Sequence, residues 1–146
     1  MVIEVIQATK QRELSHAFRI RSIVFVEEQH VPAIEEIDVL DEHTPLYVAY
    51  VAGEPVATAR LIVVDDELVK VGRVAVLKQH RGQGIGQEMM RQLMTIIKDE
   101  MKQTKVKLGA QCQVIPFYET LGFEAYGPVF LDANIEHRDM VCQIIR

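Results

Sequence analysis

A glycine-rich turn between an apolar segment and a long amphipathic segment is the part of the sequence that most directly predicts chemistry. Glycines allow left-handed backbone conformations and let an anion approach the backbone closely. The first N–H groups of a helix have no partner inside the helix, and the helix dipole makes that end positive. A diphosphate site is therefore expected here, with Arg81 as a charged donor at its rim. The turn consists of Arg81, Gly82, Gln83, Gly84, Ile85 and Gly86.

Three known diphosphate motifs compete for this turn, and two of them fail. The Walker loop requires Lys-Ser or Lys-Thr after its last glycine, where this chain has Gln87-Glu88. The Rossmann fingerprint requires G-x-G-x-x-G, and neither starting glycine gives a glycine at the third position. The acid expected to bind a ribose about 20 residues later is also missing. The remaining pattern, R/Q-x-x-G-x-G/A, is matched in full by Arg81, Gly84 and Gly86.

This pattern resembles the acyl-CoA loop of the GNAT superfamily of N-acetyltransferases. A second segment, PFYETLGF at residues 116–123, is similar to the FYxxLGF segment of the same superfamily and follows in the expected order. The resemblance extends over nearly the whole chain. In its length and in a histidine before the last strand, the chain resembles the bacterial small-molecule enzymes of the glyphosate acetyltransferase subgroup. The stretch at residues 24–41 resembles the VFVxEQ…D stretch of a related bacterial group.

Hydrophobic periodicity predicts one α+β domain spanning residues 1–146, with a mostly antiparallel sheet rather than an alternating βαβ array. The strands between residues 46 and 77 are expected to form an antiparallel meander, with a two-residue turn at Gly53-Glu54. The resemblance implies the GNAT fold, a mixed sheet that is splayed at the acyl-CoA site and flanked by helices. Strands are predicted at 2–6, 46–52, 55–64, 68–77, 106–110, 123–126 and 140–145, and helices at 10–26, 84–102 and 115–121.

An acidic segment interrupts this pattern of elements. Residues 27–43 contain seven of the 21 carboxylates and neither Lys nor Arg, and Pro32 lies in the middle. We expect a partly irregular loop. Its charge would attract a cationic molecule by electrostatic steering.

Composition excludes several classes of protein. The net charge of −5 argues against a dedicated nucleic-acid binder, which usually has a basic excess. No apolar run approaches the ~18 residues of a membrane span, and the first residues do not resemble a secretory signal. Two cysteines, Cys112 and Cys142, and scattered histidines predict no metal site. We therefore expect a cytoplasmic protein without a membrane or nucleic-acid partner.

The resemblance implies that acetyl-CoA is the co-substrate. Backbone groups of Val74 and Val76 would pair with its pantetheine arm as an added strand would, and the N–H groups from Gly82 to Gly86 would hold its pyrophosphate. The thioester would enter the gap between the strands at 73–76 and 106–110. The residues implied for the cofactor are Val74, Ala75, Val76, Arg81, Gly82, Gln83, Gly84, Ile85, Gly86 and Phe117.

The resemblance also implies catalytic residues. Acetyl transfer to an amine requires a neutral nitrogen and benefits from a proton donor near the departing thiolate. The motif places Tyr118 as the general acid. His137, before the last predicted strand, is a candidate base because histidine ionises near neutral pH. Glu27 or Glu28, acting through an ordered water, is the alternative.

Substrate contacts follow from the same subgroup. In the glyphosate-acting relatives, three arginines clamp an anionic substrate; Arg21 and Arg73 match the first two, and Gln111 stands at the third. The loss of one cation suits a less negative substrate, while the acidic segment with Glu28 favours a cationic amine. An amino-acid-like molecule, which carries both an amine and a carboxylate, satisfies both signals.

The expected function is direct acetyl transfer from acetyl-CoA to a primary or secondary amine of a small molecule. Two alternatives are an acyltransferase acting on a protein or peptide amine and a non-catalytic acyl-CoA-binding module. The intact Tyr118 argues against the second alternative. The strand edges at residues 129–130 and 141–145 could pair across a two-fold axis. Since dimers are common in the superfamily, a homodimer is expected.

Overall fold

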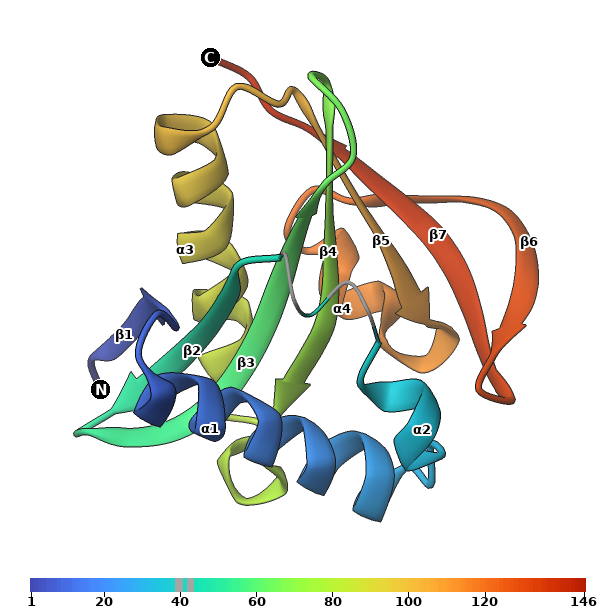
Figure 1. Ribbon diagram of the computed structural model, residues 1–146. Coiled ribbons are helices and arrows are strands. Elements are labelled where there is room, and N and C mark those ends of the chain that lie inside the picture. Colours follow the sequence, from blue (N-terminus) through green and yellow to red (C-terminus); the bar gives the residue numbers. More distant parts are fainter. Residues whose placement is uncertain (39–40, 42–43) are drawn as a thin grey trace.

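Seven strands form one mixed sheet within residues 1–38, 41 and 44–146, which are the residues that the computed structural model describes (Figure 1). The strand order is β1-β2-β3-β4-β5-β7-β6. None of the helices in these residues is long and apolar enough to cross a membrane. The elements are β1 (Ile3–Gln7), α1 (Gln11–Arg21), η1 (Ser22–Glu28), α2 (Ala33–Glu36), β2 (Leu46–Val51), β3 (Glu54–Val63), β4 (Leu68–Val76), η3 (Lys78–His80), α3 (Ile85–Glu100), β5 (Lys105–Gln111), η4 (Cys112–Val114), α4 (Ile115–Glu119), β6 (Glu124–Asp132) and β7 (Ile135–Gln143).

The two faces of the central strands pack against different helices, which confirms the predicted α+β class. Neighbouring residues of β2 point to opposite faces, so that Val48 joins the apolar cluster under α1 and Ala49 joins the cluster under α3. The α3 stripe is buried as its 3.6-residue period predicts. Its fully buried members are Ile85, Met89, Met90, Leu93 and Ile97, and Ile96 is partly buried beside them.

Strands β4 and β5 pair in parallel over only three residue pairs, from Leu68 with Lys105 to Lys70 with Lys107. Beyond them β4 stays paired with β3, while β5 pairs antiparallel with β7 along its whole length. The predicted splay of the sheet is therefore present, and the rest of β4 faces an open gap. An extra residue in β4 opposite β3 makes a bulge there, where Arg73 adopts the left-handed conformation with a φ of 51°.

Ion pairs hold the acidic segment onto the sheet. Arg21, which has no exposed surface, binds the Glu36 carboxylate at 2.8 Å and the Asp41 carboxylate at 2.7 Å. Arg60, which is 5% exposed and lies in the middle of β3, binds Asp38 at 2.8 Å and Asp41 at 3.0 Å. Buried charges persist only when they are paired and hydrogen-bonded. The sequence predicted a partly irregular loop whose charge attracts a cation, whereas the structure pairs three of its carboxylates with buried arginines.

Several element boundaries differ from those predicted. The first helix leaves the α-helical form at Arg21 and continues as the π-helix η1, and the acidic segment contains the one-turn helix α2. The hairpin turn is Ala52-Gly53, with positive φ at both residues, instead of Gly53-Glu54. Glu42 and His43, at the end of the acidic segment, lie outside the described residues.

The last two strands are much longer than predicted. Strand β6 is exposed along most of its length, so it lacks the alternation of buried and exposed residues that marks a strand. Its pairing with β7 is also interrupted between Tyr126 and Phe130, where Gly127 has a φ of 73°. Because β7 already begins at Ile135, His137 lies within this strand, directly opposite Gln111 of β5, and not before the strand as predicted.

We expect the ion pairs of Asp41 to make stability depend on pH. Burial alone would raise the pKa of Asp41, but hydrogen bonds from Arg21 and from the N–H of Asp38 lower that pKa from 3.8 to about 2. A carboxyl whose pKa is lower in the folded chain stabilises it above the unfolded pKa, and this contribution is lost as the pH falls through the folded pKa. The free energy of unfolding of the wild type should therefore fall more steeply between about pH 4 and about pH 2 than that of Asp41→Asn.

Urea denaturation at a series of pH values measures this difference. Asp99→Asn, at an exposed position of α3, is the matched control and should keep the wild-type slope. An equal pH slope in wild type and Asp41→Asn would contradict the prediction.

Candidate active site

The backbone of β4 points polar groups into the gap beside β5. The N–H of Leu77, directly after β4, donates to the carbonyl of Val56 near the start of β3, at 3.0 Å. Because successive residues of a strand point their backbone groups to opposite sides, those of Val74 and Val76 point away from β3. The Val76 carbonyl indeed accepts a hydrogen bond at 3.0 Å from Nε of Arg81, which lies on the side of β4 that faces the gap. The backbone groups of Val74 and Val76 thus point into the gap, and their pairing with a pantetheine arm, which the resemblance implies, stays a prediction.

The glycine-rich turn offers a row of backbone donors at one end of this gap. Gly82 and Gly84 have φ angles of 76° and 80°, and open space lies where a side chain on either would project. The first hydrogen bond of α3 runs from the N–H of Glu88 to the carbonyl of Gly84, at 3.0 Å. The N–H groups from Gly82 to Gln87 have no acceptor among the described residues. At the positive end of a 16-residue helix, this arrangement fits an anion such as a diphosphate.

Other residues predicted for the cofactor converge at the same end. A side chain on Gly86 would lie 3.3 Å from Cγ2 of Val76 and 3.6 Å from Cζ of Phe117, so glycine lets α3 start close to β4 and α4. Ile85 and Ala75 are buried in the two apolar clusters and support the turn and the strand from within. Gln83 is exposed on the turn. These residues fit the arm and diphosphate of an acyl-CoA.

Glu28, expected at the substrate, lies at this turn instead. Its two carboxylate oxygens accept hydrogen bonds from the Arg81 guanidinium at 2.5 and 2.8 Å. The hydrogen bond with Arg81 lowers the pKa of Glu28, against the opposite effect of burial. Glu28 does not line the cavity described next.

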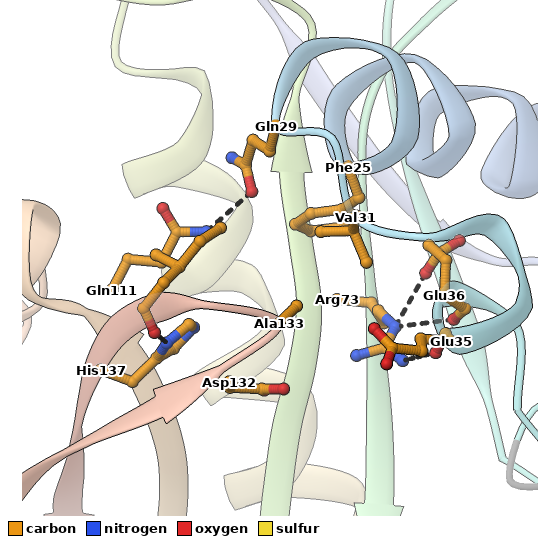
Figure 2. Close-up of a pocket in the computed structure, with 11 residues that line it drawn as sticks. Phe25, Gln29, Val31, Glu35, Glu36, Arg73, Gln111, Asp132, Ala133 and His137 are labelled. Carbon is orange, nitrogen blue, oxygen red and sulfur yellow. Dashed lines mark hydrogen bonds and ion pairs between the residues drawn. The ribbon is translucent and has the colours of Figure 1, made fainter.

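A cavity of about 270 Å³ lies at the other end of the gap, and it brings together three of the predicted site residues, Arg73, Gln111 and His137 (Figure 2). These residues come from β4, β5 and β7, so the splay of the sheet assembles them. A second hollow continues outward along His30, Pro32, Leu131 and Asn134. The cavity is lined by Phe25, Gln29, Val31, Glu35, Glu36, Arg73, Gln111, Asp132, Ala133, Ile135 and His137.

His137 has one ring nitrogen available to accept a proton. Its Nδ1 lies 2.6 Å from the carbonyl oxygen of Ile135. A carbonyl only accepts, so Nδ1 carries the hydrogen and Nε2 carries the lone pair in the neutral ring. The ring stacks on Phe130 with centroids 5.8 Å apart, which fixes its orientation. The position predicted for a general base thus holds an oriented imidazole at the cavity.

Gln111 bridges the cavity toward the helical side. Its Nε2 donates to Oε1 of Gln29 at 2.8 Å, and its Oε1 accepts from Gln113 at 3.2 Å. Gln29 follows the π-helix η1, which also carries Phe25 into the lining. Sequence reasoning missed Gln29 and Phe25. The wider turn of a π-helix, a form frequent at functional sites, has no residue pattern that would have revealed it.

The predicted arginine clamp is not assembled. Arg73 lines the cavity, but its guanidinium binds the Glu36 carboxylate at 2.8 Å and donates to the Glu36 carbonyl at 3.1 Å. Arg21 binds the same carboxylate from the opposite side and, having no exposed surface, does not reach the cavity. The expectation that Arg21 contacts the substrate is therefore wrong for this conformation. Arg60, which sequence reasoning missed, belongs to the same network.

Two carboxylates remain unpaired at the cavity. Among the described residues, Glu35 and Asp132 have no ion-pair or side-chain hydrogen-bond partner, while Glu36 is bound to Arg73 and Arg21. In Figure 2 they lie on opposite sides of the cavity, one on α2 and the other at the end of β6. The negative charge near a ligand therefore comes from these two residues rather than from the whole acidic segment. Asp132 was not predicted, because the strand expected at residues 123–126 was too short to reach it.

Tyr118 lies apart from the cavity, on α4, where it is 7% exposed. Its ring packs edge-on against Phe117 and Phe123, with centroids 4.9 and 5.9 Å away. Burial raises the pKa of Tyr118 to about 12, so the hydroxyl stays protonated at neutral pH. No hydrogen-bond partner of this hydroxyl is found among the described residues. It is a free donor, as a residue that stabilises a leaving group would be.

Cys112 and Cys142 are both free thiols. In the part of the chain that the structure describes, no group of three or more His, Cys, Asp or Glu side chains could hold a metal ion.

Comparisons with known proteins agree with this geometry. The Acetyltransferase (GNAT) domain model matches residues 8–144. The protein of Bacillus subtilis strain 168 named uncharacterized N-acetyltransferase YjcF is 38% identical over 135 residues, which make up 92% of this chain and 95% of that protein.

Solved structures show the same fold. The crystal structure of Escherichia coli ElaA superposes with a TM-score of 0.86 at 28% identity, covering 97% of this chain and 99% of that one. A GNAT family acetyltransferase from Elizabethkingia anophelis, crystallised with acetyl-CoA bound, has a TM-score of 0.75 at 19% identity and covers 97% and 98% of the two chains. The matched residues include the glycine-rich turn, the open edge of β4 and the cavity. This chain therefore belongs to the GNAT family of acetyltransferases.

Proposed function

We propose that this enzyme transfers an acetyl group from acetyl-CoA directly to a primary or secondary amine of a small molecule. One observation carries the proposal: the open edge of β4 runs from a turn of free N–H donors to a cavity that contains His137. A diphosphate on the turn and an arm along Val74 and Val76 would direct a thioester toward that cavity. The amine would enter from the side opposite the cofactor.

Each residue then has a role set by its position. Bound acetyl-CoA supplies an activated carbonyl and a thiolate leaving group. Nε2 of His137 accepts the proton that an alkylamine carries at neutral pH, because only the neutral amine attacks. The hydroxyl of Tyr118 donates a hydrogen bond to the departing sulfur. Because burial raises the pKa of Tyr118 to about 12, the phenol is protonated at neutral pH and can donate this hydrogen bond.

The charges at the cavity favour an amine that carries little negative charge. Arg73 is already balanced by Glu36, and Gln111 contributes a neutral amide where the glyphosate-acting relatives have a cation. Glu35 and Asp132 attract a protonated amine. The side-chain N–H groups of Gln29 have no acceptor in the described part of the chain and could bind one carboxylate, so an amino-acid-like substrate remains compatible with the site.

We expect a panel of amines to separate the possible activities. The panel contains amino acids, their amides, alkyl diamines, dicarboxylic and phosphonate amino acids, and a lysine peptide, with thiol release from acetyl-CoA as the signal. Amines with no carboxylate or one should react faster than dicarboxylic or phosphonate compounds. Thiol release with the peptide alone would favour a protein substrate. Acetyl-CoA binding without thiol release for any amine would contradict the proposed activity.

Replacement of Tyr118 by phenylalanine should remove the proposed donor without disturbing the ring packing. We expect kcat to fall by about 100-fold or more, the usual scale for a positioned acid, with nearly unchanged affinity for acetyl-CoA. Steady-state kinetics and calorimetry measure the two quantities. Tyr126→Phe, on the exposed strand β6, is the control. Wild-type kcat in Tyr118→Phe would exclude the role.

His137→Gln should change the dependence of rate on pH. In the wild type, kcat/KM is expected to fall toward acidic pH as Nε2 becomes protonated and can no longer accept a proton. The variant should be slower and should lose this acidic limb. His16→Gln, whose histidine instead contacts the Tyr50 hydroxyl at 2.7 Å, should keep the limb. An unchanged limb in His137→Gln would indicate a glutamate acting through water.

A further inference from the structure

The Arg81 side chain lies across the strand edge that the proposed function assigns to the cofactor. Its Nε donates to the Val76 carbonyl at 3.0 Å, and its two terminal nitrogens donate to both oxygens of Glu28. Glu28 ends the π-helix η1, so this contact joins residues 53 positions apart across the mouth of the gap. A planar guanidinium held at three points in this way has a fixed orientation.

Both contacts of Arg81 compete with groups of an acyl-CoA. An arm that adds to β4 as a strand needs the Val76 carbonyl as the acceptor for its amide N–H, and Nε of Arg81 already donates to that carbonyl. A diphosphate on the adjacent glycine turn would attract the same guanidinium that Glu28 holds. The Glu28 carboxylate would also repel the diphosphate, although Lys78 lies near enough to reduce that repulsion.

We propose that Glu28 is a positioning residue: it holds Arg81 across the open edge of β4 in the free enzyme, and the diphosphate of the cofactor takes its place when the cofactor binds. The inference rests on the proposed function. Arg81 moves from the carboxylate to the diphosphate, which frees the Val76 carbonyl for the pantetheine arm. Glu28 therefore weakens cofactor binding and makes release of the product CoA easier.

This exchange predicts that removal of the Glu28 charge increases the affinity of the enzyme for acetyl-CoA. Exposed ion pairs contribute about 0.2–1 kcal/mol, so Glu28→Gln should bind acetyl-CoA about 1.4- to 5-fold more tightly than wild type. Arg81→Gln should bind more weakly because it lacks the cation for the diphosphate. Glu27→Gln is the matched control, since Glu27 lies on the same helix and has no partner among the described residues.

Titration calorimetry with acetyl-CoA on the full chain, at low and high salt, tests this inference. In an Arg81→Gln background the effect of Glu28→Gln should largely disappear, because Glu28 acts through Arg81. An equal gain of affinity for acetyl-CoA with and without Arg81→Gln, or a loss of affinity in Glu28→Gln, would overturn the inference. The proposed function would stand in that case, because the wild type still binds acetyl-CoA. If the wild type fails to bind acetyl-CoA, both are overturned. Equal melting temperatures of the variants exclude a folding effect.

Discussion

The separation of β4 from β5 after three residue pairs is the constraint on which the site depends. Strand β5 is committed to β7 along its whole length, and β4 stays with β3, so neither strand can close the gap. Unpaired backbone groups in the middle of a sheet are costly unless water or a ligand satisfies them. The fold therefore keeps the edge of β4 open beside β5, and helices α3 and α4 pack against the face of the sheet beneath it.

Helix α2, which lines one side of the cavity with Glu35 and Glu36, is held in place by ion pairs rather than by apolar packing. Helix α2 is a single turn, too short to be stable alone, and both Ile34 within it and Ile37 directly after it are exposed. What fixes it is the sharing of Glu36 between Arg21 beneath and Arg73 in the bulge of β4. Such a network fixes the orientation of α2 more than it stabilises the fold, because the free energy needed to remove the ions from water offsets much of the gain from pairing them. The network of Arg21, Arg60 and Arg73 pairs three of the seven carboxylates of the acidic segment, Glu36, Asp38 and Asp41.

Regular features of the chain were predictable from sequence, and those that depend on long-range pairing were not. The stripe of α3, the meander from β2 to β4 and the glycine turn follow from periodicity and residue type. The pairing of Gln111 with His137 requires the register of β5 and β7, and the burial of Arg21 requires partners 15 and 20 positions away. Nothing local distinguishes a solvated carboxylate from a buried one. The family resemblance supplied Tyr118, whose catalytic part stays a prediction, as does the cytoplasmic location.

Strand β6 closes the sheet with a free edge that carries exposed Val129 and Leu131. Its ladder to β7 is broken between Tyr126 and Phe130, and Pro128 in that stretch has no N–H to donate. A foreign strand would meet a bent edge with a missing donor, which is a poor template for amyloid-like growth. The irregularity that made this strand longer than predicted thus also makes its edge a poor site for uncontrolled edge-to-edge association. A homodimer through this edge stays a prediction, and it would have to fit the bend, so that only a partner of matching curvature could pair there.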